Sequence, residues 1–144
     1  CIRWPLIIDP QAQANIWIKK WLKSNGLIVI KMDDSNFMSN LESCIRNGLP
    51  ILIENVEEWI DPVMDPIFAK DVYKKAFTYF IKMGENELQY NNDFKLFMTS
   101  RMPNPHFVPE ITIKVSVFKV GNCHQFHCDI RRPGRIVAGR SYKV

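Results

Sequence analysis

The sequence lacks several features that mark whole classes of protein. No apolar run approaches the length of a transmembrane helix, and no charged and then apolar leader stands at the start. The four cysteines are too few and too scattered for the disulfide framework of a small secreted protein, which favours a reducing compartment. The chain starts at Cys1 and not at methionine. We therefore expect an internal piece of a longer cytoplasmic protein without a membrane anchor.

The body of the chain also lacks net charge. The formal charge is +4, but the segment after residue 120 alone accounts for it, since it holds five basic residues and one acid. The remainder carries equal numbers of acidic and basic residues. A nucleic-acid-binding domain needs a basic surface, so the body does not fit that class and any such function depends on the tail.

The hydrophobic pattern is that of one α/β domain. A chain of 144 residues with 47% hydrophobic content can bury a core. Strands are predicted at 6–8, 27–31, 51–55, 94–99 and 111–118, helices at 12–23, 37–47 and 66–76, and a hairpin at 78–82 and 87–90. Cys44 falls on the apolar face of the second helix and is predicted to be a core residue. The alternation favours a mainly parallel sheet with flanking helices and a ligand edge at the carboxyl ends of its strands.

The turn after the first predicted strand has the outline of a phosphate cradle. A strand, a tight turn and a helix would direct free backbone N–H groups and the positive end of a helix dipole to the edge of the sheet. The phosphate-binding pattern G-x-x-x-x-G-K-[ST] falls on Asp9, Pro10, Gln11, Ala12, Gln13, Ala14, Asn15 and Ile16.

The residues that bind phosphate and magnesium in this pattern are missing. Both glycines are replaced, Asn15 stands in place of the lysine, and Ile16 stands in place of the hydroxyl that would hold magnesium. Asp9 adds a carboxylate where an anion would sit. Two interpretations stay open: a P-loop shape that binds nucleotide poorly or not at all, and an ordinary strand, turn and helix that never held phosphate.

A second stretch follows the same logic. The run at 51–55 ends in Glu54 and Asn55, where a nucleotide-binding sheet often ends in two acids that serve the metal and the attacking water. Glu54 could still meet a metal, whereas the Asn55 amide takes up no proton and cannot act as a general base. The alternative is a strand that ends in a turn, with Glu54 as a solvated or capping acid.

Three long segments, RWPLIIDPQAQANIWIKK, NGLPILIENVEEWIDPVMDPI and DFKLFMTSRMPNPHFVPEI, resemble the dynein heavy chain family. The segments resemble the fifth AAA+ module of the motor ring, and the resemblance covers residues 2–117. Among dyneins, the long motifs are most similar to those of axonemal heavy chains. The resemblance implies an AAA+ P-loop NTPase-like large subdomain at 1–118.

The resemblance also implies roles for single residues. Asp9 to Ile16 match the degenerate P-loop of this module, in which most members have a glycine at the position of Ala12. Glu54 and Asn55 match the degenerate acidic strand end. Thr99 to Arg101 match the end of the strand where a sensor residue would face the γ-phosphate. Arg101 there could contact a phosphate, but with the cradle disabled a structural role is favoured. His106 lies in the family's NPH loop, and no base and nucleophile accompany it.

The segment 119–144 departs from the family, whose members continue there into a helical lid. We therefore expect the lid to be absent and the segment to be a divergent, disordered basic tail. Cys123, His124, His127 and Cys128 have the right side chains for zinc, but adjacent pairs are not the spacing of usual zinc fingers, and an unstructured end is the other interpretation. The basic run at 131–143 has the charge for nucleic acid or acidic tubulin surfaces, yet it fits a solvated tail.

From the resemblance we expect a fragment of an ATP-driven microtubule motor, in which this module is a structural and transmission element that binds and hydrolyses little or no nucleotide. ATP and Mg²⁺ would then serve the parent motor. Its partners would be neighbouring AAA+ modules, microtubules and the light and intermediate chains, in the cytoskeleton or the ciliary axoneme. The alternatives are a stand-alone P-loop ATPase and a nucleic-acid binder that uses the basic tail.

Overall fold

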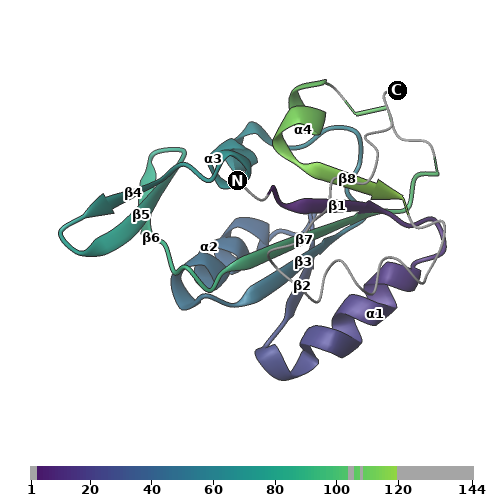
Figure 1. Ribbon diagram of the computed structural model, residues 1–144, viewed down its shortest axis with the longest axis horizontal. Coiled ribbons are helices and arrows are strands. Elements are labelled where there is room, and N and C mark those ends of the chain that lie inside the picture. The colour runs from purple at the N-terminus through teal and green to yellow at the C-terminus, as the bar shows by residue number, and fades with distance from the viewer. Residues whose placement is uncertain (1–2, 104–105, 108, 120–144) are drawn as a thin grey trace.

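The central feature of the fold is a five-stranded parallel sheet (Figure 1). The computed structural model describes residues 3–103, 106–107 and 109–119. The strand order is β2-β3-β7-β1-β8, so β1 lies inside the sheet and every paired strand runs parallel to its neighbour. The bounds are Pro5–Ile8 (β1), Ile28–Lys31 (β2), Pro50–Glu54 (β3), Lys95–Ser100 (β7) and Ser116–Lys119 (β8). The predicted α/β class with a parallel sheet is confirmed.

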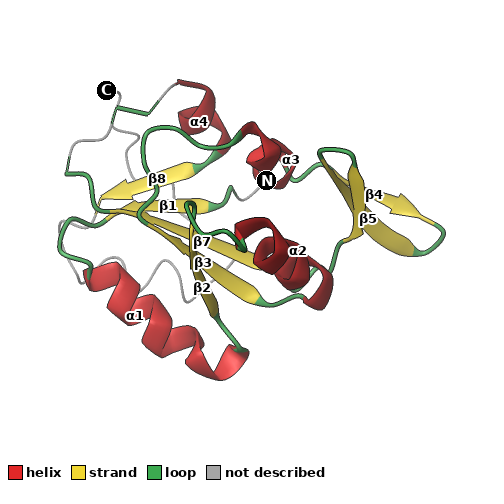
Figure 2. Cartoon of the chain, turned by 180° about the vertical axis from the view of Figure 1, so that it is seen from behind, coloured by secondary structure: helices red, strands yellow, loops and turns green. Residues whose placement is uncertain are grey.

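One helix, α1 (Gln13–Leu22), covers one face of this sheet (Figure 2). Its apolar stripe places Ala14, Ile18 and Leu22 against strand residues of that face. Trp17 stacks on Trp21 with ring centroids 5.0 Å apart, and Trp21 meets Phe97 of β7 edge-on. The helix predicted at 12–23 from its apolar spacing is therefore confirmed, and it is one residue shorter at each end.

The opposite face carries the larger core. It is covered by α2 (Phe37–Asn47), α3 (Asp65–Ala69) and α4 (Pro109–Lys114), with short 3₁₀ turns at Lys23–Asn25 and Pro62–Met64 elsewhere in the chain. Cys44 of α2 is fully buried there, which confirms its predicted core position, and burial raises the pKa of its thiol to about 11. No helix in the described part of the chain is long and apolar enough to cross a membrane.

A small antiparallel sheet projects from one end of the body (Figures 1 and 2). It consists of β4 (Val72–Lys75), β5 (Thr78–Met83) and β6 (Asn86–Gln89), which confirms the predicted hairpin. The predicted helix at 66–76 is wrong beyond Ala69. Lys70 adopts φ 50° and its N–H bonds to the carbonyls of Ile67 and Pro66, which ends the helix, and the chain then pairs with β5.

The predicted strand at 111–118 is also partly wrong. Residues Pro109–Lys114 form α4, and only the last part, β8, is a strand. Pro109 suits a first helical position, and the N–H of Val115 bonds to the carbonyl of Ile111. Ile111 and Val115 both face the core four residues apart, so the segment that resembled strand alternation also satisfies a helical period.

Candidate functional site

The carboxyl edge of the sheet forms a hollow of about 240 Å³ beside the start of α1. Its lining combines residues from the turn, the helix and the ends of β2, β3 and β7, which are Ala12, Asn15, Ile16, Lys19, Lys31, Glu54, Asn55 and Arg101. The structure thus brings together the predicted cradle, the acidic strand end and Arg101. Asp9, Pro10, Gln11, Gln13 and Ala14 were predicted with them and do not line the hollow.

Asp9 lies behind the hollow and fills the helix terminus itself. The amides of Gln13, Ala14 and Asn15 donate to its carboxylate at 3.0, 2.6 and 3.4 Å, and the residue is only 2% exposed. These are the free N–H groups of the first helical turn that a bound phosphate would need. The carboxylate also places negative charge at the positive end of the helix dipole. The anion position is therefore taken by the chain's own side chain.

The turn between β1 and α1 keeps a conformation that suits glycine. Ala12 has φ 57° and ψ 25°, its N–H donates to the carbonyl of Asp9 at 3.2 Å, and its carbonyl accepts from Ile16. A left-handed conformation costs an alanine about 1 kcal/mol relative to the right-handed helical region. The shape of the cradle is thus present at the backbone level, although no glycine supports it.

The Glu54 carboxylate at the end of β3 is paired with a cation of the same chain. Lys19 Nζ is 2.6 Å from Glu54 Oε1, and the Glu54 side chain is 13% exposed. Among the described residues that line the hollow, Glu54 is the carboxylate that could have met a metal, and it is already paired with a cation. Asn55, which follows, takes a positive φ of 55° and leads out of the strand. Among the described residues, no group of three or more metal-binding side chains comes together.

Two buried polar atoms near this edge have no hydrogen-bond partner among the described residues. They are Oδ1 of Asn15, a residue 7% exposed, and Oγ1 of Thr99, a residue 1% exposed at the end of β7. A buried, unpaired polar group costs about 1–3 kcal/mol, so native proteins rarely keep one without a reason. Both positions belong to the predicted nucleotide site, and both remain orphaned around the filled helix terminus.

Lys19 and Lys31 line the hollow and were missed from the sequence. Lys19 lies four residues after Asn15, which puts it on the same face of α1. Lys31 ends β2 directly beside Glu54 in the register, so the end of the second predicted strand could have drawn attention to it.

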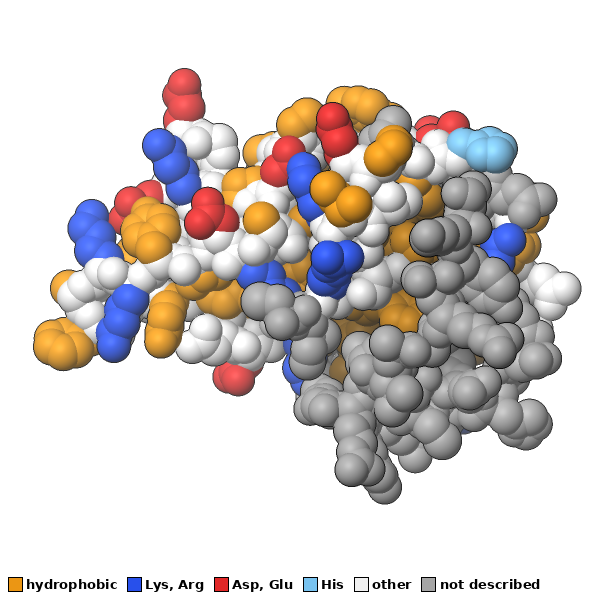
Figure 3. Space-filling model, turned by 45° about the horizontal axis from the view of Figure 1, so that its top comes forward, with side chains coloured by type: hydrophobic (Ala, Val, Ile, Leu, Met, Phe, Trp, Pro, Cys, Tyr) orange, Lys and Arg blue, Asp and Glu red, His pale blue; other side chains and the backbone are white. Residues whose placement is uncertain are grey.

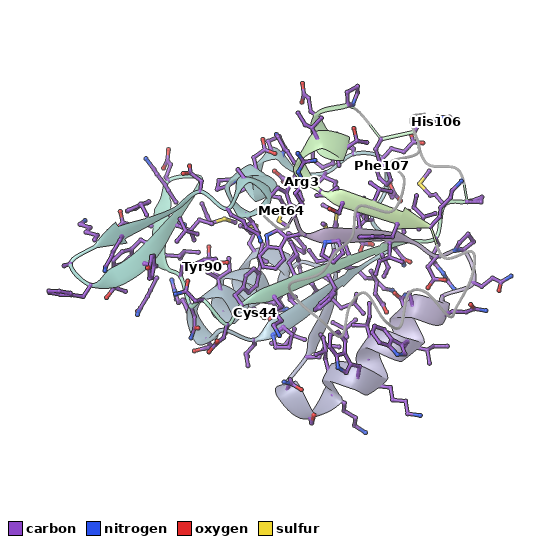
Figure 4. All side chains as sticks on the ribbon, in the orientation of Figure 1. Arg3, Cys44, Met64, Tyr90, His106 and Phe107 are labelled. Carbon is purple, nitrogen blue, oxygen red and sulfur yellow. The ribbon has the colours of Figure 1, made fainter. Side chains whose placement is uncertain are left out.

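The remaining predicted residues lie elsewhere. His106 is exposed at the outer edge of the molecule, where its backbone N–H donates to Glu58 at 2.9 Å (Figure 4). The zinc hypothesis for Cys123, His124, His127 and Cys128 and the basic run at 131–143 fall outside the described residues. Acidic and basic side chains are mixed over the visible surface that is described (Figure 3), in keeping with the neutral body.

The sequence matches proteins of known kind over most of its length. A family model described as the ATP-binding dynein motor region covers residues 1–121. The chain is 45% identical over 115 residues to human dynein axonemal heavy chain 6 and 47% identical over 113 residues to human dynein axonemal heavy chain 3. It is 41% identical over 115 residues to the dynein gamma chain of the flagellar outer arm of Chlamydomonas reinhardtii. These matches cover 78–80% of this chain but only about 3% of each relative.

Proposed function

The chain belongs to the dynein heavy chain family, as a fragment of the motor region, and we propose that it is the large subdomain of the fifth AAA+ module, acting as a ring element that binds and hydrolyses little or no ATP. On this proposal residues 1–118 form the subdomain and 119–144 a separate tail. The module holds its place in the ring and passes conformational change between its neighbours.

The observation that carries this proposal is the Asp9 carboxylate on the first turn of α1. It accepts from three amides and is almost fully buried, so a phosphate would have to displace a covalently attached anion from its own hydrogen bonds. Lys19 adds a second obstacle, because it holds the Glu54 carboxylate that a magnesium ion would require. Nucleotide and metal are both replaced by charges of the chain.

The parent protein is proposed to be an axonemal motor. Names of the relatives place them in axonemes and flagella, and a dynein heavy chain implies ATP and Mg²⁺ at other modules of the ring. Its partners would be the adjoining AAA+ modules, microtubules and the smaller dynein chains. On this proposal the module transmits force between its neighbours without a hydrolytic cycle of its own.

The test is a titration of the 144-residue chain with labelled ATP and Mg²⁺. We expect no saturable binding in the micromolar range. A matched variant restores the phosphate-binding pattern with Asp9→Gly, Ala14→Gly, Asn15→Lys and Ile16→Thr, and it should bind ATP more tightly than the parent chain if it folds as judged by circular dichroism. Saturable micromolar binding to the parent chain, with turnover, would replace the proposal by a stand-alone P-loop ATPase.

A further inference from the structure

The hollow beside α1 carries more positive charge than its own carboxylates balance. Lys19 and Glu54 neutralise each other, and Asp9 is held by the helix amides. Within the part of the chain that the structure describes, the side chains of Lys31 and Arg101 form no hydrogen bond or ion pair. Two cations thus face the hollow without a counter-ion.

A neutral donor accompanies them. Asn15 is 93% buried and lines the hollow, and no hydrogen bond to a described residue fixes its side-chain amide, whose oxygen is the orphaned atom noted above. Its NH₂ group, which forms no hydrogen bond with a described residue, is a donor for an acceptor in the hollow. The hollow offers donors and positive charge, and an occupant must bring acceptors and negative charge.

The size of the hollow limits what enters. Its 240 Å³ is below the roughly 300 Å³ at which small-molecule pockets begin. A nucleoside triphosphate needs the helix terminus for its phosphate chain, and Asp9 has closed that terminus. One tetrahedral oxyanion with its water fits the space that remains.

We propose that this hollow binds a small oxyanion of the phosphate class, held by Lys31 from the end of β2 and by Arg101 after the end of β7, with the Asn15 amide as a neutral donor. Arg101 contributes a planar fork of N–H groups that matches two phosphate oxygens, and Lys31 contributes a point charge. The inference rests on the proposed function, since it takes the α1 terminus as closed. The same chemistry is offered by free inorganic phosphate and by the terminal phosphate of a larger molecule.

Titration of the 144-residue chain with inorganic phosphate at low ionic strength tests the inference, with heat and amide NMR shifts as readouts. Binding should saturate with a dissociation constant of about 1 mM, as two charge-assisted hydrogen bonds would give, and should shift the amides of Asn15, Asn55 and Arg101. Arg101→Gln and Lys31→Gln should each weaken it about tenfold. Lys20→Gln, an exposed cation of α1 that does not line the hollow, should leave it unchanged.

The inference is overturned if binding does not saturate, or if all three variants bind phosphate equally, since that pattern indicates diffuse attraction to a basic surface. A second arm uses ATP without metal. Affinity equal to that for inorganic phosphate, lost in Arg101→Gln, supports entry of a terminal phosphate, and no ATP binding supports free phosphate. If phosphate does not bind, the proposal that Asp9 occupies the start of α1 and excludes ATP is unaffected. Micromolar ATP binding would refute that proposal, so the two proposals are tested separately.

Discussion

The Nζ atom of Lys19 lies 2.6 Å from Oε1 of Glu54, so an ion pair joins the second turn of α1 to the carboxyl end of β3. The two residues are 35 positions apart in the sequence and meet because β3 belongs to the sheet that α1 covers. The Glu54 side chain is 13% exposed and Lys19 46%, which places the pair between a surface contact and a buried one.

A double-mutant cycle with Lys19→Gln and Glu54→Gln should give a coupling energy of about 0.5–1 kcal/mol, measured by urea unfolding. The coupling should fall as salt is added, because the pair is partly exposed. The control is Lys75 with Glu87, whose atoms lie 3.6 Å apart on an exposed sheet, and we expect no measurable coupling there. Equal coupling in the two pairs would mean that burial does not strengthen the first.

Asp9→Asn should destabilise the chain by about 1–2 kcal/mol, because an amide offers one acceptor oxygen in place of a carboxylate that serves three N–H groups. Chemical unfolding monitored by tryptophan fluorescence measures the change. Asp33→Asn, at an exposed acid outside any helix cap, should stay within about 0.5 kcal/mol of the parent. An unchanged free energy of unfolding in Asp9→Asn would contradict the role of this carboxylate in stabilising the start of α1.

Gly48→Ala should be more damaging than Gly84→Ala. Both glycines have a positive φ, 68° and 60°, so each substitution bears the left-handed cost of about 1 kcal/mol. A Cβ at Gly48 would also lie 2.6 Å from Cγ of Asn91, whereas at Gly84 the nearest atom is 4.0 Å away. The difference between the two variants in unfolding free energy isolates the clash, and adding Asn91→Ala to Gly48→Ala should recover part of it.

The projecting sheet should respond to pH through Tyr73 and Glu87. The Tyr73 hydroxyl donates to Glu87, which lowers the pKa of that carboxyl below 4.5 and raises the pKa of Tyr73 to about 12. Because the folded pKa of Glu87 is depressed, its contribution to stability is present above the unfolded value and is lost as the pH falls through the folded one. The tyrosine contribution is present below the unfolded value and is lost as the pH rises through about 12.

Tyr73→Phe should therefore lose less thermal stability than the parent when the pH is lowered from neutral to about 3. The difference in ultraviolet tyrosinate titration between parent and variant should show one group that ionises at about 12. A Tyr73 that titrates at the ordinary value would mean that the contact to Glu87 does not persist in solution.

Local pattern was sufficient for the first two strand and helix units and for the third strand, because each apolar face there has one period and turn signals such as Asp9-Pro10 and Asn47-Gly48 follow several of these elements. It failed where two periods fit the same residues. Val72 continues the helical spacing of Ile67 and Phe68, yet it pairs with Ile81, and this pairing depends on a strand that comes later in the chain. The helical spacing of Ile111 and Val115 was likewise hidden within an alternating run.

The site could be predicted as a set of positions but not as a balance of charges. The degenerate motif located Asp9 and Asn15, the acidic strand end located Glu54, and the family resemblance located Arg101, all at one edge because parallel strands end together. Which charge meets which is decided by tertiary packing, so the pairing of Lys19 with Glu54 and the approach of Lys31 could not be read from spacing.

The attachment of Asp9 to the backbone distinguishes its carboxylate from a dissolved anion at the start of α1. A dissolved ligand comes and goes with its concentration, whereas a tethered group stays at a fixed, high local concentration. The occupancy of the α1 terminus by this carboxylate is thus independent of the ratio of ATP to ADP in the surrounding solution.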